Sequence, residues 1–531
     1  MFENRFYSDA DCRFVKFRGL KVDWTNFVRD NWNKSNAHRT PFQRDLDRLV
    51  FSGPFRRLQG KTQVRRTGPK CYSRTRLSHS MEVARIAHSL VNRLYFLTLP
   101  KPESFVDLDL VEFACYAHDI GNPPFGHAGE RELNACMGDH GGFEGNAQSL
   151  RIITEIGWSR RAKTNPTRTG IEPTQAAVES ILKNQELHRD KKGTPEQRSK
   201  FLYDYQGKLI ETLSIANSQS LECQIMDIAD DIANALIDYA DGVRAGIINE
   251  DTLNEQRNVG YLDKSIMNRL RRTLKYDSID AYAIWQIGEC MKSFQVETGR
   301  PEVRSGWKVS LDEEHRDLIK TLKRIDARVL FKNADIQAND NSGAFIIRVM
   351  FEAFANHYCE KASDSLYKKE IIPMDWHQRM ENSEKEERYR LVADFISGMT
   401  DDYAKMIYDK VIETGSTCWG YAQRILFASH PAFRRFADLT GTPYRVYFTN
   451  RPELEAWLLV RGWRQPDESW GLDSDSVCEY PGKEYYLKIT HNIFDEDGNL
   501  KHFNEKNWDD EWIQVKKLQT PPDVEPDDIL F

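Results

Sequence analysis

The chain has 531 residues, of which 40% are hydrophobic and 29% are charged. This length suits roughly three average domains, or one large helical body with an appendage, and it excludes a single small core. The 74 Lys and Arg residues against 81 Asp and Glu residues give a net charge of −7. That balance argues against a general nucleic-acid or membrane-surface binder but leaves room for a local basic patch.

The sequence also predicts the compartment. No uncharged apolar run reaches the roughly 18 residues of a membrane span, and the first five residues contain an acid and start no apolar signal segment. Nine cysteines are scattered from Cys12 to Cys478 without a CxxC pair, which favours neither a disulfide framework nor a thiolate zinc site. We expect a soluble, reduced, cytoplasmic protein with no membrane partner.

Helical periodicity dominates the chain up to about residue 410. The helical patterns cover residues 78–97, 108–118, 146–156, 174–183, 222–240, 315–331, 344–361 and 384–408. The second of these helices should stop at Gly121 and the Pro123-Pro124 pair. By the alternation test, no convincing strand precedes about residue 440.

The composition changes beyond that point. Short aromatic and β-branched runs at 444–448, 484–490 and 512–516 are separated by Gly, Pro, Asn and Asp. Residues 520–528 are acidic and proline-rich, which predicts a poorly ordered tail. The predicted fold class is therefore mainly α, with a helical body over residues 1–410 and a small α+β C-terminal appendage over residues 411–531.

A first candidate site lies at the end of the helix 108–118, where His118 and Asp119 are adjacent. Imidazole nitrogen and carboxylate oxygen together suit a divalent cation such as Mn, Fe, Co, Zn or Mg. A second histidine, His79, opens the helix 78–97. At about 100° per residue, His88 falls on the opposite face of that helix, so only one of the two can face a shared site.

The segment 226–241 supplies acids at helical spacing. One broad face of that helix contains Asp227, Asp230, Asn234, Asp238 and Asp241, and Asp231 turns away by about 100°. The rest of the helix is rich in Ile, Ala and Leu. The polar face is therefore either exposed to solvent or lines a polar pocket that binds a cation.

Between Asp47 and Glu82 the chain has no acid. The same stretch contains nine cations: Arg48, Arg56, Arg57, Lys61, Arg65, Arg66, Lys70, Arg74 and Arg76. Such a stretch can bind phosphates, or it can serve as a basic face for nucleic acid or a neighbouring subunit. The chain has no GxxxxGK[ST] motif, so phosphate recognition would rest on side chains and metal.

The order of His79, His118-Asp119 and Asp230 resembles the metal signature of the HD-domain phosphohydrolases, and the match extends further. Five blocks in order resemble the bacterial deoxyguanosine-triphosphate triphosphohydrolases: Arg57–Val64, Thr75–Val83, His118–His127, Phe143–Gln148 and Ile396–Asp401. The resemblance covers roughly residues 39–410, with the core motifs in residues 76–241. It implies a helical HD fold that hydrolyses dGTP, and other dNTPs with it, to deoxynucleoside and tripolyphosphate.

The resemblance also implies roles for individual residues. The metal ligands would be His79, His118, Asp119 and Asp230, holding Mn²⁺ or Mg²⁺, with Co²⁺, Fe²⁺ or Zn²⁺ as alternatives. His127 would be the in-line catalytic histidine that protonates the leaving 5′-oxygen, directly or through water. Glu130, three residues later, would share its helix face and act as its partner.

Substrate contacts follow from the same resemblance. Gln63 would contact the sugar 3′-hydroxyl, Arg76 an α-phosphate oxygen, and Asp238 the region near the sugar. Asn146, Lys183 and Lys200 match positions on the triphosphate side. Four residues after the metal aspartate the family commonly has a Tyr that packs under the deoxyribose, whereas this chain has Asn234. The sequence therefore leaves open whether the site rejects nucleotides with a 2′-hydroxyl.

Two other functions remain as alternatives. One is an HD phosphohydrolase that acts on another nucleotide or on nucleic-acid ends, and the other is a non-catalytic nucleotide or single-stranded DNA sensor. The resemblance further implies a homo-oligomer, often a hexamer, that responds to single-stranded DNA or to a nucleotide activator. Residues 411–531 have no counterpart in the resemblance.

Overall fold

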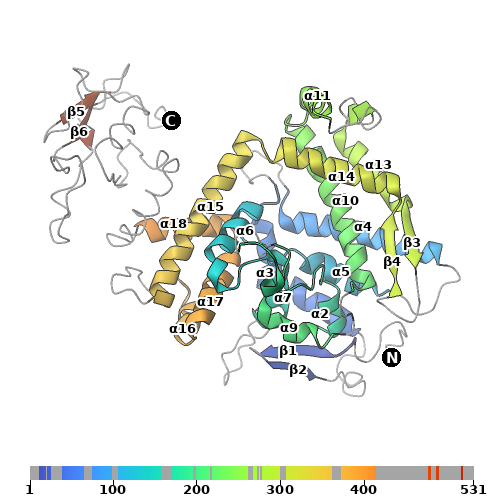
Figure 1. Cartoon of the computed structure of the whole chain (residues 1–531), viewed down its shortest axis with the longest axis horizontal. Helices are drawn as coiled ribbons and strands as arrows, with labels where there is room; N and C mark the ends of the chain where they lie inside the picture. The colour runs from blue at the N-terminus through green and yellow to red at the C-terminus, as the bar shows by residue number, and fades with distance from the viewer. Residues whose placement is uncertain are drawn as a thin grey trace. The chain divides into compact units, whose positions relative to one another are not determined.

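The computed structural model describes most of the chain up to residue 413 and three short strands after it. The described residues are 11–18, 21–25, 39–64, 74–98, 106–156, 170–194, 199–213, 215, 218–260, 267–268, 270–271, 274, 278–298, 306–360, 372–413, 476–479, 486–489 and 516–517. The chain divides into two compact units, Met1–Glu413 and Thr414–Phe531. The mainly α prediction is confirmed by the helices of the first unit (Figure 1).

Three helices form the centre of the first unit. They are α4 (Arg76–Leu97), α5 (Leu108–Ala117) and α10 (Leu221–Arg244), and each contacts the other two (Figure 1). Their facing surfaces are apolar: Val83, Phe113 and Ala229, for example, are fully buried. Burial of such side chains is the main favourable contribution to folding, at about 25 cal/mol per Å² of apolar surface.

Local sequence fixes where these helices begin. The Thr75 side chain accepts a hydrogen bond from the Ser78 N–H, and the Ser78 hydroxyl accepts one from the Thr75 N–H, which forms a capping box for α4. Asp107 caps α5 and Ser220 caps α10 in the same manner, through their side-chain oxygens. Because His79 lies in the first turn of α4, the capping box also fixes the position of a candidate ligand.

Further helices surround this centre. Before α4 lie α2 (Pro41–Val50) and α3 (Gly53–Arg57); after α5 come α6 (Gly126–Cys136), α7 (Gly145–Arg151), α8 (Gln175–Glu179) and α9 (Gly207–Ile210). After α10 come α11 (Glu250–Asn258), α13 (Ile279–Lys292), α14 (Glu313–Ile325), α15 (Ala334–Ala355), α16 (Met374–Glu381), α17 (Lys385–Ser397) and α18 (Asp401–Glu413). Helix α15 packs against α6, α17 and α18 (Figure 1).

The predicted helix 384–408 is two helices, α17 and α18, because the chain breaks at Gly398, Met399 and Thr400. The Thr400 hydroxyl accepts a hydrogen bond from the Tyr403 N–H and so starts a new helix. The helices predicted at 146–156 and 315–331 both end in a π-helical turn, Ile152–Ile156 and Asp326–Leu330.

The expectation of no strand before about residue 440 is wrong. Two antiparallel hairpins occur there, β1 (Phe14–Arg18) with β2 (Lys21–Thr25) and β3 (Phe294–Thr298) with β4 (Lys308–Leu311). In β4 Val309 and Leu311 are buried while Lys308 is exposed, so the alternation exists. Four or five residues are too few for that alternation to stand out in a helical sequence.

In the second unit, the described residues form one antiparallel sheet of β5 (Ser476–Glu479), β6 (Tyr486–Ile489) and β7 (Lys516–Lys517). The predicted strand at 484–490 contains β6, and the one at 512–516 reaches β7. The predicted strand at 444–448 and the tail at 520–528 lie outside the described residues. None of the described helices has the length and apolar character needed to cross a membrane.

Candidate functional site

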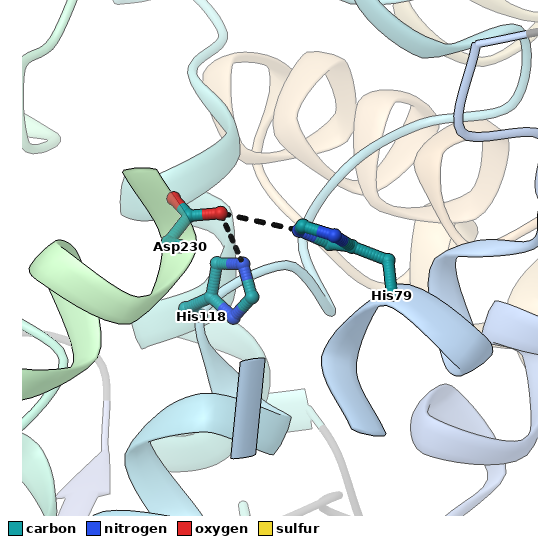
Figure 2. A group of neighbouring side chains, drawn as sticks. All are labelled: His79, His118 and Asp230. Atoms are coloured by element: carbon teal, nitrogen blue, oxygen red, sulfur yellow. Dashed lines mark hydrogen bonds and ion pairs between the residues drawn. The ribbon is translucent and has the colours of Figure 1, made fainter. Parts of the chain in front are cut away.

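Three helices bring two histidines and one aspartate together (Figure 2). His79 comes from α4, His118 follows the last residue of α5, and Asp230 comes from the middle of α10. Asp230 Oδ1 lies 3.1 Å from His79 Nε2 and 3.6 Å from His118 Nε2. Two atoms that bind one ion at about 2.1 Å lie about 3.0–3.5 Å apart, so these spacings suit a shared divalent cation.

The hydrogen bonds of His118 leave one nitrogen for a metal. His118 Nδ1 lies 2.7 Å from the Cys115 carbonyl oxygen, which requires the proton on Nδ1. His118 Nε2 then carries a lone pair; it is buried and has no hydrogen-bond partner among the described residues. A buried acceptor without a donor is costly, and a cation between the three side chains would remove that cost. The residues present therefore fit a metal ion.

The charges of the site also favour a cation. Burial alone would raise the pKa of Asp230, but Lys183 and His118 outweigh it and hold that pKa well below its usual range. In the same manner His118 and Arg76 outweigh burial at Asp119 and lower its pKa. Both carboxyl groups are therefore ionised at neutral pH, the form that binds metals.

The two histidines differ in protonation. Burial lowers the pKa of His79, against the opposing effect of Asp230, so His79 is neutral near pH 7. Burial acts in the same direction on His118, but Asp119 and Asp230 outweigh it and raise the His118 pKa. In the absence of a metal, His118 is therefore the ligand that holds a proton more readily.

Asp119 lies beside the three-residue cluster. Its Oδ1 is 3.6 Å from His118 Nε2 and accepts a hydrogen bond from Asn122 Nδ2 at 2.7 Å. Its Oδ2 accepts one from Arg76 NH1, also at 2.7 Å. Arg76 thus orients the predicted fourth ligand in addition to its predicted contact with phosphate. Asn122 was missed as an orienting residue, although it lies within the block His118–His127 that carries the resemblance.

The prediction that only one of His79 and His88 can face a shared site is confirmed. His79 is fully buried against Asp230, whereas His88 is half-buried and its Nδ1 lies 3.3 Å from Arg85 NH1 on the same helix. On α10, Asp230 faces the histidines while Asp231 forms an ion pair with Lys323 of α14. On the polar face of α10, Asp230 therefore faces the two buried histidines, whereas the Asp227 side chain is 42% exposed.

Lys183 and Asn234 flank the cluster. Lys183 Nζ lies 2.7 Å from Asp230 Oδ2 and 3.0 Å from Asp227 Oδ1. Asn234 Nδ2 donates to Asp230 Oδ1 at 2.7 Å, and Asn234 Oδ1 accepts from Gln63 Nε2 at 3.4 Å. The residue that departs from the family pattern thus joins the predicted sugar-binding glutamine to the predicted metal aspartate.

Asp238 has a partner that the sequence did not single out. Arg74 forms ion pairs with both Asp238 and Glu82, and its side chain is 7% exposed. Burial raises the pKa of Asp238 to about 7 despite Arg74. The signal for Arg74 was its place directly before the Thr75 block, in an acid-free stretch. Arg65, Arg66 and Lys70 of that stretch lie outside the described residues.

The other triphosphate-side candidates are less closely tied to the cluster. Asn146 Nδ2 donates to Glu144 Oε1 at 2.7 Å at the start of α7. Lys200 is exposed and has a positive φ of 56°. The bond to Glu144 does not link Asn146 to the histidines, and the exposure of Lys200 does not place it at the cluster. The predicted phosphate contacts of both residues stay predictions.

His127 and Glu130 lie in the first turns of α6, a helix that the periodicity did not predict. His127 is exposed, while Glu130 is half-buried and its Oε1 accepts a hydrogen bond from the Gly145 N–H at 2.8 Å. Asp340 of α15 also lies near His127: burial raises the pKa of Asp340, and the neighbouring Arg131 and His127 oppose that rise. The pairing of His127 with Glu130 stays a prediction, and Asp340 is a second carboxyl group near this histidine.

The backbone just before His127 has an uncommon conformation. Phe125 caps α6 with a φ of 63°, in the left-handed region, and Gly126 follows at 58°. A bulky residue there costs about 1–3 kcal/mol and persists only where its surroundings hold it. A Cβ at Gly126 would lie 3.6 Å from Arg76 NH2, so this bend brings the start of α6 next to Arg76.

Comparison with known families agrees with this geometry. Residues 76–235 match the model of the HD domain, and residues 309–410 match that of the phosphohydrolase-associated domain. The histidine and aspartate cluster lies entirely within the first match. The fold and the site together define an HD-domain phosphohydrolase.

Individual relatives narrow the class. A deoxyguanosinetriphosphate triphosphohydrolase-like protein of Caulobacter sp. (strain K31) is 32% identical, over 69% of this chain and 88% of its own length. A protein of the same description from Shewanella pealeana is 31% identical, over 72% of this chain and 94% of its own length. Another from Shewanella sp. (strain ANA-3) is 30% identical, over 71% of this chain and 93% of its own length. The chain belongs to this deoxyguanosinetriphosphate triphosphohydrolase-like family.

Proposed function

We propose that the protein is a metal-dependent dNTP triphosphohydrolase that converts dGTP, and other dNTPs with it, to the deoxynucleoside and tripolyphosphate. The observation that carries the proposal is the cluster of His79, His118 and Asp230. Lys183 lies beside Asp230, and Arg76 lies beside the neighbouring Asp119. The description shared by its relatives names the substrate class.

The metal would be held by His79, His118, Asp119 and Asp230, with Mn²⁺ or Mg²⁺ as the expected ion. A divalent ion bound there would polarise an α-phosphate oxygen and acidify a bound water. Arg76 and Lys183 supply positive charge for phosphate oxygens next to the same carboxylates. Stabilisation of the charge that develops on these oxygens would supply much of the rate.

Hydrolysis between the α-phosphorus and the 5′-oxygen needs a proton for the departing oxygen. His127 is the proposed donor, because it is exposed at the start of α6, next to the residue that approaches Arg76. Glu130, or Asp340 of the facing helix α15, would keep this imidazole charged. Water adds to phosphorus as the bond to the 5′-oxygen breaks, and the 5′-oxygen leaves with the His127 proton. The proton that the water loses restores the imidazole through solvent, and intact tripolyphosphate is released with the nucleoside.

Asn234 supports a second candidate, a phosphohydrolase that also accepts ribonucleotides. Its amide lies between Gln63 and Asp230, where the family commonly has a tyrosine under the deoxyribose. A shorter polar side chain leaves room and a hydrogen-bond partner for a 2′-hydroxyl. Asn234→Tyr should then lower kcat/KM for NTPs relative to dNTPs.

Product analysis tests both candidates. The purified protein is incubated with Mn²⁺ or Mg²⁺ and each dNTP or NTP, with and without single-stranded DNA, and nucleosides are resolved from nucleotides and tripolyphosphate. Deoxynucleoside with tripolyphosphate supports the proposal. Release of phosphate or pyrophosphate contradicts it and favours another phosphohydrolase. Binding without turnover, in protein shown to hold its metal, favours a sensor.

We also propose, from the family resemblance, a cytoplasmic homo-oligomer, expected as a hexamer, that single-stranded DNA or a nucleotide activates. Light scattering during gel filtration measures the assembly. A monomer under all conditions would contradict this expectation without touching the proposed reaction.

A further inference from the structure

The block Ile396–Asp401 contributes no metal ligand and no predicted substrate contact, although it belongs to the family resemblance. It joins the end of α17 to the start of α18 in the phosphohydrolase-associated domain. Two buried polar side chains, Asp401 from this block and Lys61 opposite it, connect the block to the loops of the candidate site. Asp401 is 5% exposed and Lys61 is 2% exposed.

The carboxylate of Asp401 accepts three hydrogen bonds from two distant segments. Its Oδ2 accepts from the Thr62 N–H at 3.1 Å and from the Thr62 hydroxyl at 2.6 Å. Its Oδ1 accepts from the Phe125 N–H at 3.0 Å. One side chain therefore fixes the spacing between the segment that carries Gln63 and the segment that carries His127.

Lys61 makes the complementary connection. Its Nζ donates to the carbonyl of Asn122 at 2.5 Å and to the carbonyl of Ser397 at 2.8 Å. The Asn122 side chain in turn donates to Asp119. A donor between two buried carbonyls holds the end of the His118-Asp119 motif against α17.

The packing between these segments leaves little freedom. A Cβ at Gly60 would lie 2.7 Å from Thr400 Cγ2, and a Cβ at Gly343 of α15 would lie 2.5 Å from the Phe125 Cβ. The left-handed Phe125 is thus confined on one side by α15 and bonded on the other by Asp401. A conformation that L-residues rarely adopt is kept at the residue two before His127.

We propose that Asp401 is a positioning residue that sets His127 and Gln63 in register with the metal ligands. The proposal rests on the proposed function, because it assumes that His127 donates a proton and that Gln63 binds the sugar. Asp401 touches neither substrate nor metal in this role. It acts through the Thr62 and Phe125 amides, so its loss should affect the chemical step more than nucleotide binding.

The test is Asp401→Asn, with Asp402→Asn as the matched control because Asp402 is the exposed neighbour. In either orientation of the new amide, one backbone N–H faces an NH2 group and loses its acceptor. Asp401→Asn should keep its metal content while kcat falls about 10²-fold, the cost of a misplaced reacting group, and KM should rise by a smaller factor because Gln63 shifts as well. A kcat equal to that of Asp402→Asn overturns the proposal.

Thr62→Val is a second test, for use if Asp401→Asn lowers the midpoint of thermal unfolding and a loss of activity could reflect instability. It removes only the hydroxyl bond to Asp401 and keeps both backbone bonds, so a smaller fall in kcat is expected. An unchanged kcat in a stable Thr62→Val protein overturns the proposal.

Hydrogen exchange separates this proposal from the proposed function. In metal-loaded protein, amides of residues 62 and 125–130 should exchange faster in Asp401→Asn than in Asp402→Asn, whatever reaction the wild type performs. Equal protection in the two variants overturns the positioning role. Absence of tripolyphosphate from the wild type, with faster exchange in Asp401→Asn, overturns the proposed reaction alone.

Discussion

Asp230 has more partners than any other residue of the candidate metal site. It faces two histidines through one oxygen and Lys183 through the other. Asp230→Ala should therefore abolish metal retention and turnover together, as measured by elemental analysis and product formation. Asp231→Ala is the control, because Asp231 pairs with Lys323 on another face of α10. Loss of metal from Asp231→Ala and not from Asp230→Ala would show that Asp231, and not Asp230, is the metal ligand.

His127 is exposed and makes no contact with the metal cluster that would tie its loss to metal binding. His127→Ala should keep metal and nucleotide binding while kcat falls by about 10²-fold, the usual scale for a general acid. Metal content, KM and kcat are measured together. His88→Ala, on the far side of α4, should leave all three unchanged. Equal loss of nucleotide affinity and rate in His127→Ala would show that His127 has a structural role.

Metal affinity should depend on pH through His118. Its pKa lies above the ordinary 6.5 because Asp119 and Asp230 outweigh burial, and a metal must displace that proton. Affinity should be full at high pH and should fall as pH drops through the raised His118 pKa. His79, whose pKa is lowered, protonates at lower pH. Mn²⁺ titrations from about pH 8 to about pH 5 measure this. A dissociation constant that stays flat to below about pH 6 would contradict it.

At the scale of elements, the loop after α5 depends on close contact with α7. A Cβ at Gly121 would overlap the carbonyl of Gly145 and the N–H of Ser149. Gly121→Ala should therefore force α7 away from the His118-Asp119 motif and destabilise the protein by about 3 kcal/mol. The midpoint of thermal unfolding measures the change.

A second glycine provides the contrast. Gly288 lies within α13, and nothing surrounds its Cβ position. Gly288→Ala should be neutral or stabilise by about 0.5–1 kcal/mol, because alanine loses less backbone freedom in a helix. Equal thermal midpoints for the two variants would mean that the loop after α5 can move away from α7 at little cost.

At the scale of the whole molecule, all described residues of the candidate site lie in the unit Met1–Glu413. A chain ending at residue 413 should therefore keep its metal and form the same products as the full chain. Elemental analysis and product analysis of the truncated protein measure both. Loss of metal on truncation would show that residues 414–531 support the site, which the sequence alone did not predict.

The sequence determined the helical class and the residues of the metal cluster. Helix periodicity and capping residues such as Thr75 and Asp107 act within a few positions of the chain, so they can be read locally. The family resemblance singled out His79, His118 and Asp230, and the structure brings these three side chains together. Helical rotation showed that only one of His79 and His88 can face a shared site, and the family resemblance singled out His79.

Only the tertiary structure decided what those residues touch. The Asp401 bonds to Thr62 and Phe125 span 339 and 276 positions, and no local pattern predicts partners at such separations. The ion pairs of Lys183 with Asp230 and of Arg74 with Asp238 could not be predicted either, since an ion pair depends on which segments come together in the fold. Two short hairpins were likewise missed, because backbone pairing between strands supplies stability that the strand sequences do not display.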